Sequence, residues 1–145
     1  MKPVSRLVSI TLGSLGLAAT LAVTPLASAA SPASTAISAR QANFKKMGGA
    51  MKVLKDELAG SADKAKMLAA AKTLAAVSRQ QVKLFPAGSG PSSGVKTEAL
   101  PTIWTDRATF DKETKALIAE ADKLVAAVGK GDAAAQFKAV GATCG

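Results

Sequence analysis

Apolar residues recur every three or four positions along four segments of this 145-residue chain. That spacing places them on one face of an α-helix, and such a face is stabilised when it packs against other helices. The predicted helices cover residues 34–58, 62–84 and 102–128, with a shorter fourth that begins at residue 133. The sequence therefore predicts an all-α fold, an antiparallel four-helix bundle with a shortened fourth helix.

The breaks between these segments predict how the helices connect. Ser61 after Gly60 is the expected N-cap of the second helix, and Asp132 that of the fourth. Residues 85–101 are rich in proline and glycine and predict a long crossover between the second and third helices. Helix connections in bundles usually take two to eight residues, so this loop is either functional or merely permissive.

Residues 1–29 have the pattern of an export signal. Lys2 and Arg6 precede an apolar stretch, and Ala27 and Ala29 form a small-residue cleavage site. We expect cleavage after Ala29, which leaves residues 30–145 as the bundle. An N-terminal membrane anchor is the alternative, but Pro25 interrupts the apolar run and no basic flank follows it.

Charge and composition exclude several function classes. The chain has 19 Lys and Arg against 10 Asp and Glu, a net charge of +9, which favours acidic partner proteins or an anionic surface. Nucleic acid is not an expected partner, because the lysines alternate with acids and the chain carries an export signal. Without histidine the chain lacks the commonest metal ligand and a Ser-His or Cys-His pair. We therefore do not expect an enzyme.

Cys144 is the single cysteine and cannot form a disulfide within the chain. In an exported protein it is a reactive thiol, an intermolecular bridge or a covalent attachment point. It lies in the predicted fourth helix with only Gly145 after it and no helix stop signal. We therefore expect this chain to be truncated at its C-terminal end.

The first predicted helix carries the candidate binding residues. Arg40 and Gln41 lie one turn before Phe44, on the side of the predicted helix that is expected to face the bundle interior. Arg40 is either a surface residue at the helix edge or a guanidinium held for the carboxylates of a ligand. Gly48 and Gly49 weaken a helix and are tolerated where another helix or a flat ligand approaches closely. Four large apolar residues are expected to be plain core: Phe44, Met47, Met51 and Trp104.

Four stretches of the chain follow one another in the order and at the spacing of a known protein family. They are residues 39–52, residues 84–89, Thr97-Glu98 shortly before residues 101–104, and residues 137–144. Together they resemble cytochrome c′, the four-helix class II c-type cytochromes. In that family the last helix continues from this cysteine into Cys-x-x-Cys-His, where two thioethers attach haem and histidine ligates iron. Cys144 matches the first of those cysteines.

The resemblance also implies roles for the other candidate residues. Arg40 and Gln41 match residues that face the haem propionates, and Thr97 and Glu98 match a loop pair at the haem edge. Phe44 matches the bulky residue that covers the distal face of the iron. Methionine ligation by Met47 or Met51 is the alternative there, and the match favours Phe44.

The resemblance implies a periplasmic haem c protein that transfers electrons and binds small gases such as nitric oxide. Its redox partner is expected to present an acidic surface, and a homodimer through the first two helices is implied by the resemblance alone. Two alternatives remain open from the residues themselves. One is a haem-free helical module that binds another apolar ligand, and the other is a non-functional truncated remnant.

Overall fold

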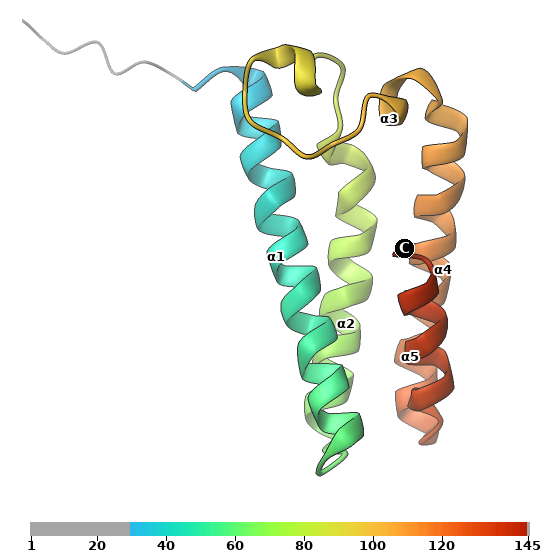
Figure 1. The fold of residues 1–145 in the computed structure, drawn as a ribbon. Coiled ribbons are helices and arrows are strands. Elements are labelled where there is room, and N and C mark those ends of the chain that lie inside the picture. Colours follow the sequence, from blue (N-terminus) through green and yellow to red (C-terminus); the bar gives the residue numbers. More distant parts are fainter. Residues whose placement is uncertain (1–29, 145) are drawn as a thin grey trace, which may run out of the picture.

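Three long helices and a shorter fourth run alternately up and down and form an antiparallel bundle (Figure 1). The computed structural model describes residues 30–144 and has no strand in that part of the chain. The fold class predicted from the sequence is confirmed, including the crossover before the third long helix. The elements in chain order are α1 (Pro32–Ala59), α2 (Lys64–Gln81), η1 (Val82–Leu84), η2 (Pro91–Ser93), α3 (Thr102–Thr105), α4 (Arg107–Lys130) and α5 (Ala133–Ala142).

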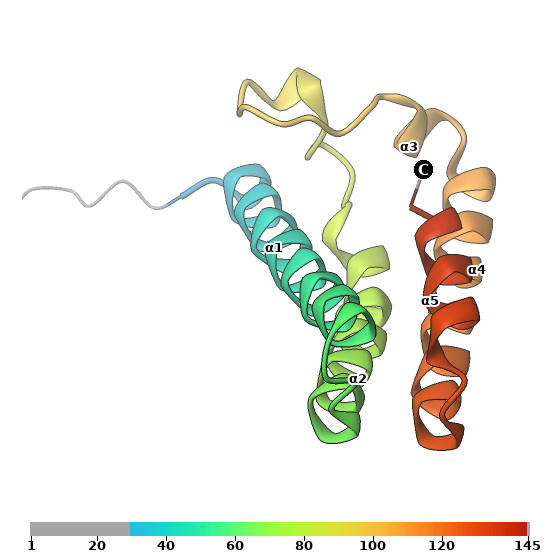
Figure 2. The same ribbon diagram turned by 60° about the horizontal axis from the view of Figure 1, so that its bottom comes forward.

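The core lies along the contacts of α2 with its neighbours. Helix α1 packs on α2, α2 on α4, and α4 on α5, whereas α1 and α5 touch each other much less. Figure 2 shows α1 beside α2 and, facing that pair, α4 beside α5. Leu54, Leu74, Leu124 and Val140 are completely buried between these helices. Three helix pairs, α1 with α2, α2 with α4 and α4 with α5, therefore hold the bundle together, and the packing between α1 and α5 is looser than in these pairs.

The second helix begins later than predicted. The N-cap of α2 is Asp63 and not Ser61, because the Asp63 carboxylate accepts hydrogen bonds from the backbone N–H groups of Ala65 and Lys66. The Ser61 hydroxyl instead donates to the carboxylate of Glu57. An ionised carboxylate near a helix N-terminus also interacts favourably with the helix dipole.

The predicted third helix is interrupted at Asp106. This residue has φ −126° and ψ 63°, outside the helical region, and its side chain accepts from the backbone N–H of Thr109 to cap α4. The short α3 before it carries Trp104, whose indole N–H donates to the carbonyl of Pro86 at 3.0 Å. Trp104 is half-buried against the crossover and lies outside the main apolar core, which corrects the core prediction for this residue.

The buried face of α1 is also rotated from the predicted one. Arg40, Asn43, Met47 and Ala50 are buried, while Phe44 is 51% exposed. The physical reason is that α1 makes its extensive contact with α2 alone, so only the side facing α2 is covered. Phe44 is consequently not plain core, whereas Met47 is.

Among residues 30–144, no helix is both long and apolar enough to span a bilayer. The predicted signal peptide at residues 1–29 lies outside the described residues. Its presence stays a prediction.

Replacing Leu54 with alanine tests the packing of α1 on α2. Leu54 is fully buried, so L54A is expected to lower the free energy of unfolding by about 2–5 kcal/mol through lost burial and a cavity. The adjacent Val53 is 40% exposed, and V53A is expected to change it by no more than about 0.5 kcal/mol. Urea unfolding followed by circular dichroism measures both, and equal effects would contradict this packing.

Candidate functional site

Two neighbouring cavities lie beside α1, the first between α1 and α4 and the second between α1 and the crossover. We call the first, of about 530 Å³, the bundle cavity; its lining includes Met47, Gly48, Gln81, Phe110, Leu117 and Cys144. The second, of about 790 Å³, is the loop-side cavity, and residues 97–100 of the crossover form part of its wall. The two share Phe44, Phe85, Ile103 and Cys144. Each volume is within the range of about 300–1,000 Å³ typical of small-molecule and cofactor sites.

All the binding residues predicted from the sequence border the loop-side cavity. They are Arg40, Gln41, Phe44, Thr97, Glu98 and Cys144. Three separate parts of the chain contribute them: α1, the crossover, and the segment that follows α5. Arg40 is buried, Thr97 is half-buried, and the other four are exposed. The fold therefore brings these residues to one cavity, although they are up to a hundred positions apart in the sequence.

Arg40 joins α1 to the crossover. Its guanidinium donates to Ser89 Oγ at 3.1 Å, to the Ser89 carbonyl at 2.7 Å and to Thr97 Oγ1 at 2.6 Å. The same group lies over the ring of Phe85, 4.9 Å from its centroid, and near that of Trp104. Ser89 is completely buried. The interpretation of Arg40 as a surface residue is therefore wrong, and the side chain fixes the crossover over the end of α1.

The charge of Arg40 has no acidic partner among the described residues. The side chain is only 2% exposed. Burial lowers the pKa of its guanidinium, yet arginine stays protonated at any physiological pH. Neutral hydrogen-bond acceptors and aromatic faces stabilise this charge. A buried cation at the wall of a cavity favours an anionic group on whatever occupies that cavity.

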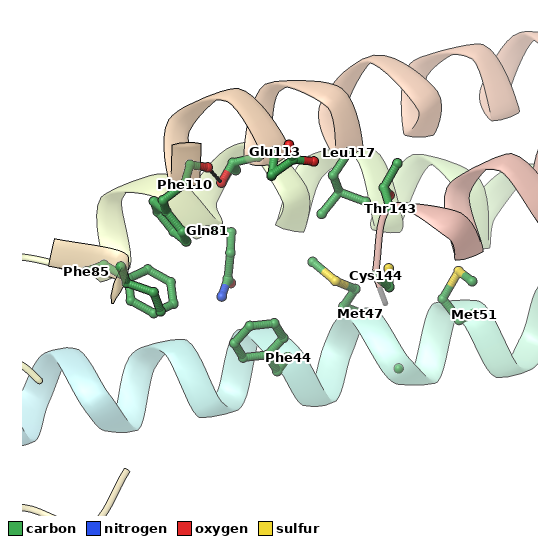
Figure 3. Close-up of a pocket in the computed structure, with 13 residues that line it drawn as sticks. Phe44, Met47, Met51, Gln81, Phe85, Phe110, Glu113, Leu117, Thr143 and Cys144 are labelled. Carbon is green, nitrogen blue, oxygen red and sulfur yellow. Dashed lines mark hydrogen bonds between the residues drawn. The ribbon is translucent and has the colours of Figure 1, made fainter. Parts of the chain in front are cut away.

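Aromatic rings and apolar side chains form most of the surface of the bundle cavity (Figure 3). Phe85 and Phe110 meet edge to face with their centroids 4.9 Å apart. Phe44 lies on the α1 side, opposite Phe110 and Leu117 of α4 (Figure 3). The exposed thiol of Cys144 borders the same space. The cavity therefore combines a surface that excludes water with one nucleophilic sulfur.

A buried pair of amides was not predicted from the sequence. Asn43 Nδ2 donates to the carbonyl of Val77 at 2.9 Å and to Gln81 Oε1 at 2.5 Å. Gln81 occupies a position in the apolar stripe of the predicted second helix, and a polar residue at such a position is a signal that could have identified it. Asn43 carries no comparable signal, because its burial depends on which side of α1 faces α2.

The structure distinguishes the two explanations for Gly48 and Gly49, which are the close approach of another helix and that of a flat ligand. A Cβ atom at either glycine would meet nothing within 4 Å, so no other helix approaches closely there. Gly48 lines the bundle cavity and Gly49 lines neither cavity. The space beside Gly48 is therefore open to an occupant of the cavity.

The bundle, its apolar cavity and the adjoining buried cation define a helical bundle built to hold a cofactor or another apolar ligand. Comparison with known families makes this specific. The family model of cytochrome c′ matches residues 35–145. The chain belongs to the cytochrome c′ family, whose cofactor is haem c.

Solved structures of the family superpose on most of the chain. Cytochrome c′ from Thermochromatium tepidum is 29% identical, with a TM-score of 0.72, and the match covers 80% of this chain and 92% of that one. A cytochrome c′ described as having ligand-controlled dimer dissociation is 26% identical, with a TM-score of 0.73 and the same coverage. The nitric oxide complex of a variant of Alcaligenes xylosoxidans cytochrome c′ is 27% identical, with a TM-score of 0.70 and the same coverage. No curated protein sequence matches significantly.

The residues present fit a haem in two respects, the lining of the cavities and one point of covalent attachment. The apolar lining, the open space beside Gly48 and the cation of Arg40 suit a flat apolar ring with acidic substituents, and Cys144 offers the sulfur of a thioether. The 145 residues contain no histidine. The described residues hold no group of three or more histidine, cysteine or acidic side chains placed to bind a metal ion.

Replacing Arg40 with methionine tests its role in fixing the crossover. R40M removes three hydrogen bonds and leaves buried Ser89 without its donor, so the free energy of unfolding is expected to fall by about 2–4 kcal/mol. Amide hydrogen exchange is expected to speed up in residues 86–101 in particular.

The control is R79M, which removes the surface ion pair with Asp122. That change is expected to lower the free energy of unfolding by less than about 1 kcal/mol and to leave exchange in the crossover unchanged. If R40M and R79M behave alike, Arg40 does not hold the crossover.

Proposed function

We propose that this protein is a periplasmic carrier of haem c that transfers single electrons and performs no catalysis of its own. The observation that carries the proposal is that six residues expected to surround haem all border one cavity. Membership of the cytochrome c′ family supports the choice of cofactor. The export pattern in residues 1–29 supports the compartment.

In this proposal each wall of the two cavities has a task. Phe44, Phe85 and Phe110 exclude water from the macrocycle and lower the local dielectric constant, which influences the reduction potential. Phe44 would cover one face of the bound macrocycle, and a gas that enters on that side would have to displace its ring. The bound haem supplies one-electron iron chemistry. Cys144 contributes the sulfur that attaches the cofactor covalently.

Arg40 provides the electrostatic part of the site. Its buried charge lacks a carboxylate partner in residues 30–144, and the propionates of haem are the anions proposed to complete it. Gln41 and Glu98 lie exposed at the edge of the same cavity, and Thr97 already accepts from Arg40. The proposed role of Arg40 and Gln41 is to orient the acidic edge of haem, whereas Thr97 and Glu98 pack at the haem edge.

Gas binding, dimerisation and the redox partner extend the same proposal. A related protein forms a nitric oxide complex and another undergoes ligand-controlled dimer dissociation, which supports binding of small gases and a homodimer here. The net charge of +9 and the exposed lysines near the cavity, such as Lys45, support a partner with an acidic surface.

A haem-free binding module is the second candidate function. The lining of both cavities supports it, because a mainly apolar surface also binds apolar ligands other than a porphyrin. In that case the same apolar cavities hold another ligand, and the buried cation of Arg40 still favours one that carries an acid.

Leucine at position 48 tests whether haem occupies the bundle cavity. Both G48L and G49L are expected to raise the free energy of unfolding by about 0.5–1 kcal/mol, because glycine weakens a helix. Only G48L places a side chain in the cavity, and it is expected to weaken haemin binding by about tenfold or more. Quenching of the single tryptophan, Trp104, during titration of the purified chain with haemin measures the affinity.

Saturable binding of haemin to the natural chain and to G49L, with weak binding to G48L, is the result that supports the proposal. If the natural chain, G48L and G49L all bind haemin equally well, the porphyrin lies outside the bundle cavity. Absence of any saturable binding leaves the haem-free module as the better candidate.

A further inference from the structure

Gln81 presents a hydrogen-bond donor to the bundle cavity. It is the last residue of α2, its side chain is only 4% exposed, and it lines this cavity together with Phe44 and Phe85. Figure 3 shows its amide group reaching into the space between these two aromatic rings. Among the buried side-chain nitrogen and oxygen atoms of residues 30–144, Gln81 Nε2 alone lacks a hydrogen-bond partner.

Asn43 fixes which end of the Gln81 amide enters the cavity. The carbonyl of Val77 can only accept, so the Asn43 atom 2.9 Å from it must be the NH₂ nitrogen. That same nitrogen lies 2.5 Å from Gln81, and the facing atom of Gln81 must therefore be its oxygen. The NH₂ end of Gln81 is then forced away from Asn43, toward the cavity. The orientation follows from the hydrogen-bond network and does not depend on telling nitrogen from oxygen.

A buried donor without an acceptor destabilises a protein, and none of the polar residues in the lining accepts from Gln81 Nε2. Aromatic and aliphatic side chains dominate the lining, and rotation of the amide would place its NH₂ against the donor of Asn43. An acceptor atom on an occupant of the cavity would satisfy this group.

We propose that Gln81 donates a hydrogen bond from Nε2 to a small ligand held in the bundle cavity on the side that Phe44 covers. The inference rests on the proposed haem function and deepens it. It makes Gln81 a residue that determines which small molecules the site retains, favouring those with a hydrogen-bond acceptor. Phe44 selects by size and Gln81 selects by polarity.

Carbon monoxide is the probe for this inference. The purified chain is loaded with haemin, reduced with dithionite and exposed to carbon monoxide, and the C–O stretch and the dissociation rate are recorded. In Q81M we expect the stretch to move to higher frequency and dissociation to become about tenfold faster, as expected for loss of one hydrogen bond. The exposed neighbour provides the control, and Q80M is expected to leave both quantities unchanged.

A stability measurement on the haem-free chain distinguishes a ligand-binding amide from a structural one. In the double variant N43L/Q81M both partners become apolar, so the urea midpoint is expected to stay the same or rise. A large fall in that midpoint would show that the pair exists to hold α1 on α2, and it would overturn the inference without any haem present.

The outcomes separate this inference from the proposed function. If the natural chain takes up no haemin, the proposed haem function fails, and the inference that rests on it fails too. If haemin binds but Q81M has the C–O stretch and dissociation rate of the natural chain, only the role of Gln81 is wrong.

Discussion

The buried guanidinium of Arg40 is the interaction on which the site depends. It donates hydrogen bonds to Ser89 and Thr97 of the crossover and lies over the ring of Phe85. These contacts hold the crossover over the end of the bundle where α1 begins. A charge placed there is stabilised only by neutral acceptors and aromatic faces within the described residues. The same interaction therefore shapes the loop-side cavity and makes it attractive to an anionic group.

The pattern of helix contacts explains why a cavity exists at all. Helix α2 packs against both α1 and α4, whereas α1 and α5 scarcely touch. Large side chains of α1 that point away from α2, such as Phe44, consequently border open space. Gly48 enlarges that space, and a folded bundle retains an apolar chamber where interior packing is normally dense.

Helical periodicity, together with the proline and glycine content of residues 85–101, was sufficient to predict the antiparallel bundle and its crossover. It could not predict the break at Asp106, because the spacing of Ile103, Phe110 and Leu117 continues across that residue as in one helix. Nor could it predict which side of α1 is covered, and so it missed Asn43. The six candidate binding residues came from resemblance, and their gathering at one cavity depends on long-range contacts that spacing alone does not reveal.

We propose that these helices enclose haem attached through Cys144. The most direct test is the pyridine haemochrome spectrum of the protein isolated from the periplasm of a host that matures c-type cytochromes, recorded after acid–acetone extraction. We expect c-type bands that remain with the polypeptide and disappear in C144A. A colourless protein that is nevertheless stably folded would contradict it.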